Sequence, residues 1–153
     1  MLRIVSLAPS NTEILYALGC EKNTIAVTKL CDYPAIAENT ERIGTWTETD
    51  TEKLAAMKPD LILTSYYLPK ALHTYTGPGE IYHINPKTLQ DVYDSIMELG
   101  AFLDKTFEAQ NLVSRMQQKI QKIKQCSQQH AKKVSVYAEE WWNPPMAGGN
   151  WIP

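Results

Sequence analysis

Tyrosine and tryptophan are concentrated in segments that follow short, apolar, strand-like runs. The chain has only two Phe but eight Tyr and four Trp, and all four Trp lie in loop segments. The positions that follow these runs are Pro9, Ser10, Asn11, Leu30, Cys31, Asp32, Tyr33, Trp46, Tyr66, Tyr67 and residues 139–142. Flat rings with a polar edge suit a large amphiphilic ligand that is held by stacking and hydrogen bonding. The group as a whole favours a ligand pocket, although any single ring is equally well explained as a plug at the end of the core.

Catalytic chemistry has little support in the same segments. Ser6, Ser10 and Ser65 lack the Gly-x-Ser-x-Gly turn of a hydrolase nucleophile, and no histidine lies near them in sequence. The best titratable pair, Asp32 with Tyr33, is more typical of a turn. We therefore expect a protein that binds its ligand and is not an enzyme. A small α/β hydrolase is the rival interpretation from another class.

Metal and phosphate sites are weakly supported too. His73, His83 and His130 lack the close spacing of a metal cluster, and no Gly-x-Gly-x-x-Gly or P-loop motif follows the first strand-like run. Ser10 and Asn11 at a helix start could bind an anion, but both residue types also cap helices without a ligand. We expect no metal site and no cofactor of the protein's own.

Charge and composition exclude several classes of protein. The 15 basic residues are outnumbered by 17 acidic ones, which gives a net charge of -2 and argues against a nucleic-acid partner. With 44% apolar residues the chain is too apolar for a disordered protein. Cys20, Cys31 and Cys126 are too far apart for a zinc site, and we expect small, partly buried residues, with a Cys20–Cys31 bridge as the minor alternative.

The sequence shows neither a membrane span nor an export signal. No apolar run approaches the roughly 20 residues that cross a bilayer. Met1 leads almost directly into a strand-like run, without the basic segment and apolar stretch of a signal peptide. We expect a cytoplasmic protein if this is the native N-terminus, or an exported one whose signal has been removed.

Predicted strands alternate with predicted helices along the first hundred residues. Short runs rich in β-branched residues predict strands at 3–7, 24–28, 61–64 and 80–84. Helices are expected to begin at capping boxes formed by Ser10 with Glu13 and by Thr49 with Glu52, and at residues 86–88. The alternation predicts an α/β fold with an open, mostly parallel sheet that is flanked by helices.

One long amphipathic helix is predicted from residue 104 to about residue 129. The segment contains no Pro or Gly, and its apolar residues recur at steps of four and three, at Ala109, Val113, Met116, Ile120 and Ile123. At 1.5 Å per residue this helix is about 35 to 40 Å long. We favour a helix packed along a domain or between two domains over a coiled-coil zipper. A further strand-like run at 133–138 then has nothing left to pair with.

Five segments together resemble one family. They are RIVSLAPSNTEILYALG from residue 3, VTKLCDYP from residue 27, IGTW from residue 43, DTEKLAAMKPDLIL from residue 50 and VYAEEWWNPPMAGGNWIP from residue 136. In this order and register they look like the substrate-binding proteins of cobalamin and iron-siderophore ABC importers, in which a rigid helix joins two lobes. The CDYP and EEW segments point to the cobalamin-binding branch.

The resemblance implies a clamshell that binds its ligand between two α/β lobes. By position, the ligand-facing residues of the first lobe are Pro9, Ser10, Leu30, Cys31, Trp46 and Tyr66. Glu52 matches the acidic residue that docks onto the membrane permease of the importer. The implied ligand is a corrinoid, cobalamin. The alternative is a haem or iron-siderophore receptor in which Tyr66 or Tyr67 serves as an iron ligand.

The resemblance also divides the chain into three parts. Residues 1–103 would be the first α/β lobe, residues 104–130 the long connecting helix, and residues 131–153 the start of an incomplete second lobe. The partners implied are the permease subunits of the importer and a small-molecule ligand, and the unfinished lobe could mediate self-association. The family implies a location in the periplasm or cell envelope.

Overall fold

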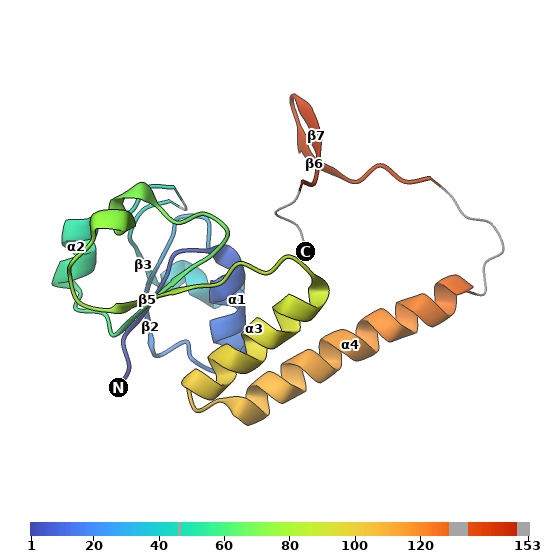
Figure 1. The fold of residues 1–153 in the computed structure, drawn as a ribbon, viewed down its shortest axis with the longest axis horizontal. Coiled ribbons are helices and arrows are strands. Elements are labelled where there is room, and N and C mark those ends of the chain that lie inside the picture. The colour runs from blue at the N-terminus through green and yellow to red at the C-terminus, as the bar shows by residue number, and fades with distance from the viewer. Residues whose placement is uncertain (46, 129–134, 150–153) are drawn as a thin grey trace. The chain divides into compact units, whose positions relative to one another are not determined.

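The structure is a computed structural model that describes residues 1–45, 47–128 and 135–149. The chain forms two compact units, Met1–Asn85 and Pro86–Pro153 (Figure 1). Within the described residues, no helix combines the length and the apolar character needed to cross a membrane. The division of the chain near residues 103 and 130 stays a prediction.

The first unit is built on a parallel five-stranded sheet. Its strands are β1 (Ile4–Ser6), β2 (Thr24–Val27), β3 (Glu41–Arg42), β4 (Leu61–Thr64) and β5 (Glu80–His83), in the spatial order β3-β2-β1-β4-β5. Every pair of neighbours is parallel. The predicted α/β class is therefore confirmed. The four predicted strands are present, and β3, with only two residues, is the strand that the sequence pattern did not indicate.

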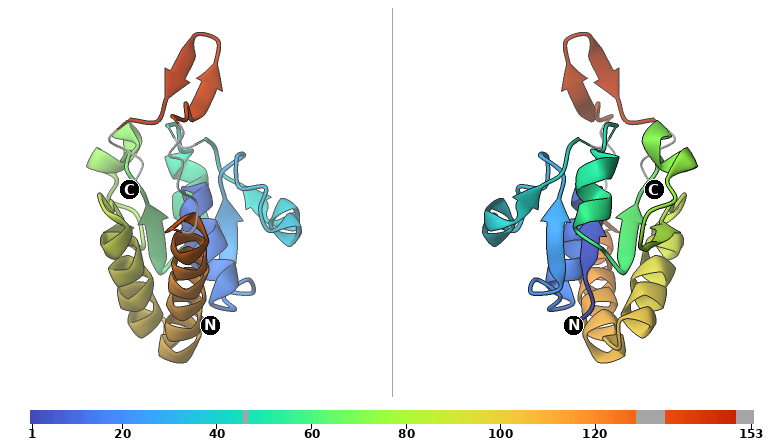
Figure 2. Two further views of the ribbon diagram at one scale, coloured as in Figure 1. Left: turned by 90° about the vertical axis from the view of Figure 1, so that its right-hand side faces the viewer. Right: turned by 90° about the vertical axis from the view of Figure 1, so that its left-hand side faces the viewer.

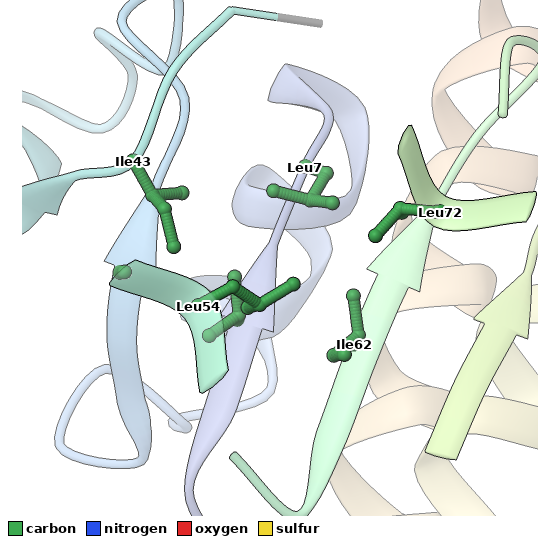
Figure 3. Packing of buried hydrophobic residues seen from close by; sticks show 7 residues of the cluster. Leu7, Ile43, Leu54, Ile62 and Leu72 are labelled. Carbon is green, nitrogen blue, oxygen red and sulfur yellow. The ribbon is translucent and has the colours of Figure 1, made fainter. Parts of the chain in front are cut away.

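Helices cover both faces of this sheet (Figure 2). Helix α1 (Pro9–Ala17) and helix α2 (Thr51–Ala56) lie on opposite faces, because the right-handed crossovers from β1 to β2 and from β3 to β4 run in opposite directions across the sheet. Two 3-10 turns, η1 (Ala35–Asn39) and η2 (Lys70–Thr74), complete the connections. Figure 3 shows Leu54 of α2 and Leu72 of η2 packed over one face of the sheet.

That face holds a continuous apolar core. The packed residues are Val5, Leu7, Ala26, Ile43, Leu54, Ile62 and Leu72, each no more than 3% exposed. Side chains two apart on a strand, such as Val5 and Leu7, share a face because successive residues alternate across the sheet. This core holds the ends of the strands in place, and therefore also the starts of the loops that follow them.

Two predicted capping boxes are corrected by the structure. The N-cap of α1 is Ala8 with Pro9 in the first helical turn, so Ser10 lies inside the helix and does not cap it. The N-cap of α2 is Asp50, whose Oδ1 accepts a 2.9 Å hydrogen bond from the amide of Lys53. Thr49 Oγ1 is instead buried without a hydrogen-bond partner among the residues that the structure describes. Both predicted N-caps were therefore wrong. Pro9 begins α1 and Asp50 caps α2, so Ser10 and Thr49 do not serve these roles.

The second unit contains two long helices and a hairpin. Helix α3 (Leu89–Phe102) begins at a capping box of Thr88 and Asp91 and lies beside helix α4 (Thr106–Gln128), which confirms the long helix predicted from the apolar stripe (Figure 1). Gly100 makes their close approach possible, since a Cβ at this position would lie 2.4 Å from the Cβ of Ala109. The two helices therefore pack almost backbone to backbone at this crossing.

The strand predicted at 133–138 is corrected as well. Residues 133 and 134 lie outside the described residues, and residues 135–138 are not in a strand. Strand β6 (Glu139–Trp142) begins after them and pairs antiparallel with β7 (Pro145–Ala147). The predicted run is therefore not the strand, and β6, which follows it, pairs with a strand that the Pro-rich sequence after residue 142 did not suggest.

Candidate functional site

The candidate site lies at the carboxyl edge of the parallel sheet. Loops leave this edge after β1, β2, β3 and β4, and ligands of open α/β sheets collect at such edges. The first residues beyond the strands are still tied to their neighbours, with Leu7 N donating to Leu63 O at 2.8 Å and Ile43 N to Val27 O at 3.0 Å. The sheet thus brings the loops that carry the predicted residues to one edge.

Four of the six predicted ligand residues present accessible surface at this edge. Leu30 and Tyr66 are each 52% exposed, Ser10 is exposed, and Pro9 is half-buried. An exposed leucine after β2 and an exposed tyrosine after β4, on the two sides of β1, provide apolar area for a bulky ligand. Trp46, the predicted stacking residue, lies outside the described residues.

Cys31 differs from the other predicted residues because its side chain is fully buried. Its Sγ lies 3.2 Å from Thr12 Oγ1 and 3.1 Å from Thr28 Oγ1. Thr12 Oγ1 also lies 2.8 Å from Ser6 Oγ, so that a buried polar cluster joins β1, α1 and the loop after β2. Every member of this cluster has a partner, which is the condition under which buried polar groups stabilise one conformation. Cys31 therefore anchors its loop from inside.

A second buried contact links α1 to the other side of the site. Asn11 is 1% exposed, and its Nδ2 donates to the carbonyl of Thr64 at 3.0 Å, at the end of β4. Thr64 Oγ1 in turn lies 2.8 Å from His83 Nδ1 on β5. Asn11 therefore does not cap α1, and its amide instead holds the loop that carries Tyr66. Thr12 and His83 were not predicted, because long-range contacts of this kind leave no local signal in the sequence.

Two acidic side chains, Glu13 and Asp32, lie close enough to interact. Partial burial, and then the charge of Asp32, raise the pKa of Glu13 above its usual value of 4.5. Glu13 belongs to α1, and Asp32 follows the buried Cys31. Across residues 1–45, 47–128 and 135–149, His, Cys, Asp and Glu side chains form no group of three that could hold a metal ion.

Glu52, the predicted docking residue, lies on the surface. It belongs to the first turn of α2, where a negative charge is favourable for the helix dipole. Because Asp50 caps the helix, the Glu52 carboxylate is not needed for the capping box that the sequence suggested.

The hairpin of the second unit carries the other aromatic segment. Trp141 and Trp142 on β6 are 58% and 76% exposed, and Trp141 Nε1 donates to Asn143 O at 3.0 Å. A cavity beside the hairpin is lined by residues 136–140 and 147–149. Exposed tryptophans on a short hairpin form an apolar surface of the kind that usually contacts another molecule or segment.

Comparison with known proteins places these features in one family. The model of the periplasmic binding protein family matches residues 4–152. The vitamin B12-binding protein of Pectobacterium atrosepticum is 32% identical over 133 residues, which cover 84% of this chain and 47% of that protein. The vitamin B12-binding protein of Vibrio vulnificus is 37% identical over 105 residues, which cover 67% of this chain and 38% of that protein.

Solved structures agree with this placement. The periplasmic vitamin B12 binding protein of Vibrio cholerae superposes with a TM-score of 0.77 at 27% identity, covering 95% of this chain and 58% of that one. A protein of Staphylococcus epidermidis described as a possible iron-binding (periplasmic solute-binding) protein gives a TM-score of 0.75 at 28% identity, covering 93% of this chain and 57% of that one. The chain spans about half the length of the curated relatives it matches. It belongs to the periplasmic binding protein family, a family of ligand receptors and not of enzymes.

Proposed function

We propose that this chain is the first lobe, connecting helix and start of the second lobe of a substrate-binding protein for an ABC importer, with a corrinoid as its ligand. The observation that carries the proposal is the cluster of accessible side chains at the carboxyl edge, held from inside by Thr12, Asn11 and Cys31. Relatives at 32% and 37% identity are vitamin B12-binding proteins, which favours cobalamin over other large ligands.

In this proposal Pro9, Ser10, Leu30, Trp46 and Tyr66 contact one face of the ligand. Cys31 contributes through its loop, since its side chain is buried. A site that covers only one face of a large ligand binds it weakly, because burial of most of the ligand surface is what gives pockets their affinity. We expect micromolar or weaker binding by this chain and tighter binding once a second lobe is added.

The proposal extends to partners and location. Glu52 on α2 would dock onto the basic surface of a permease, and the protein would work in the periplasm or cell envelope, as its family does. Residues 1–103, 104–130 and 131–153 would be the first lobe, the connecting helix and the start of the second lobe. The exposed Trp141 and Trp142 give this last part the apolar surface on which copies of the chain would self-associate.

Tryptophan fluorescence with a ligand panel tests the proposed function. The purified chain is titrated with cyanocobalamin, haemin and a ferric hydroxamate, with N-acetyltryptophanamide as the control for absorption of light by the ligands. Saturable quenching by cyanocobalamin at a lower concentration than by the other two is expected. Saturable quenching by haemin or the hydroxamate alone would replace the corrinoid by an iron-containing ligand, for which the exposed Tyr66 is the candidate contact.

A further inference from the structure

Arg42, at the end of β3, holds both ends of the turn that carries Leu30. Its Nη1 donates to the carbonyl oxygen of Thr28 and to that of Cys31, each at 2.8 Å. The amide of Cys31 donates to the same Thr28 oxygen at 3.2 Å, which closes the turn. One guanidinium nitrogen therefore bridges the first and last residues of a four-residue turn.

The turn is anchored on its inner side, and its tip faces outward. Lys29 N donates to Gly44 O at 2.8 Å, and the Cys31 thiol is buried against Thr12 and Thr28. Leu30 stands between these anchors and is 52% exposed. Because both ends of the turn are held by hydrogen bonds, Leu30 presents its apolar surface in one orientation. This lowers the conformational entropy that is lost when a ligand binds.

Arg42 is itself held in place. Its backbone pairs with Val27 on β2, and its carbonyl oxygen accepts a 2.8 Å hydrogen bond from Lys53 Nζ of α2. Lys53 also forms an ion pair with Glu41. Arg42 is half-buried, and hydrogen bonds from a charged donor are stronger in such a place than at a fully solvated surface. These contacts hold β3 in place although it has only two residues, so that Arg42 can position the turn that carries Leu30.

We propose that Arg42 is a positioning residue of the ligand site, which sets the orientation of Leu30 without touching the ligand. The inference rests on the proposed function, because Leu30 has to face the ligand for Arg42 to matter to binding. Arginine suits this role because its planar group can direct two N–H bonds from one nitrogen to two carbonyls, which a lysine ammonium does with less fixed geometry.

The structure offers a matched control in Arg3. Its Nη2 and Nε donate to Met57 O at 2.6 and 3.1 Å, and Nε also reaches Lys58 O at 3.2 Å. This is the same kind of tether between a guanidinium and loop carbonyls, but it lies just before β1, at the amino edge of the sheet. Arg42→Met and Arg3→Met therefore remove comparable hydrogen bonds, and only the first lies at the candidate site.

The binding test uses the full chain, with cyanocobalamin as the probe. Arg42→Met should raise Kd about tenfold, because the released turn must be ordered again when the ligand binds, while Arg3→Met should change Kd less than about twofold. In a Leu30→Ala background, Arg42→Met should have little further effect, because its target side chain is gone. Equal effects of the two arginine variants, or full additivity with Leu30→Ala, would overturn the proposal. Arg42→Lys, which keeps the charge, should fall between wild type and Arg42→Met and serves if the latter does not fold.

Amide hydrogen exchange separates the inference from the proposed function. Arg42→Met or Arg42→Lys should speed exchange of the Cys31 amide by about tenfold or more, and Arg3→Met should leave it unchanged. If wild type does not bind cyanocobalamin, the proposed function fails, and unchanged exchange at Cys31 would separately refute the positioning role.

Discussion

Thr12 Oγ1 on α1 lies 3.2 Å from the Sγ of Cys31 in the loop after β2. The same hydroxyl lies 2.8 Å from Ser6 Oγ at the end of β1, so one threonine joins the first two loops of the candidate site. All three side chains are fully buried. The positions of the loops at the candidate site therefore depend on contacts in the buried core.

Removal of the Thr12 hydroxyl should lower both the stability of the fold and the affinity of the site for its ligand. Thr12→Val keeps the shape but leaves Ser6 and Cys31 with one partner fewer, at a cost of about 1–3 kcal/mol in the free energy of unfolding. Thr24→Val is the control, since Thr24 Oγ1 is also buried and donates to Cys20 O at 2.9 Å, at the other end of β2. Urea unfolding should show losses for both variants. Cyanocobalamin affinity should fall only for Thr12→Val, and an equal fall for Thr24→Val would argue against a specific role.

Glu13 should make stability depend on pH. Its pKa is raised by partial burial and then by Asp32, so the folded chain holds this proton more tightly than the unfolded chain does. Stability therefore decreases as pH rises from about 4.5 to the folded pKa, and the decrease persists at neutral pH. Glu13→Gln should unfold at higher urea than wild type at pH 7 and at the same urea near pH 4. An advantage of the same size at both pH values would exclude ionisation as its cause.

The crossing of α3 and α4 should depend on Gly100. A Cβ there would lie 2.4 Å from that of Ala109 and 3.1 Å from Lys105 O, so Gly100→Ala must push the helices apart. We expect a loss of about 1–3 kcal/mol, despite the better helix propensity of alanine. Ala109→Gly should cost about 1 kcal/mol in wild type and much less in the Gly100→Ala background. Strict additivity of the two substitutions in urea unfolding would refute the close contact.

Glu52 should affect docking and not folding. Asp50 caps α2, so Glu52→Arg removes a favourable helix-dipole interaction worth less than about 1 kcal/mol. Charge at a rim mainly controls encounter and orientation. In a chain completed with a second lobe, Glu52→Arg should leave ligand affinity intact and abolish stimulation of the cognate transporter, whereas Glu38→Arg on η1 should not. Wild-type stimulation by the Glu52 variant would remove the docking role.

The sequence predicted the strands whose residues carry their own signal. The runs that form β1 and β4 are short, apolar and rich in β-branched residues, so burial and strand geometry coincide. Strand β3 has two residues, Glu41 and Arg42, and exists only because β2 is beside it. A pattern based on periodicity cannot detect such a strand.

The sequence pattern predicted that the candidate site lies at the carboxyl edge of the sheet, but it could not predict the contacts within the site. Loops that follow parallel strands share an edge, and this placed Leu30 and Tyr66 on the same side of the sheet. The burial of Cys31 and the tether from Arg42 depend on tertiary distances between segments that are 11 to 19 residues apart. No local pattern encodes them. The capping errors at Ser10 and Thr49 have a simpler cause, since neighbouring Pro9 and Asp50 serve the helix starts better.

Equilibrium dialysis against cyanocobalamin, with wild type, Leu30→Asp and Ile36→Asp side by side, tests whether the carboxyl edge of the sheet binds a corrinoid. Ile36 is a matched control, because it is 59% exposed in the same connection from β2 to β3 but lies on η1, beyond the turn of residues 28–31 that carries Leu30. A carboxylate at position 30 should place an unpaired charge against an apolar ligand face and weaken binding by at least about tenfold. We expect wild type and Ile36→Asp to retain cyanocobalamin and Leu30→Asp to lose it. No retention by wild type, or equal retention by the two aspartate variants, would show that Leu30 does not lie at a corrinoid site.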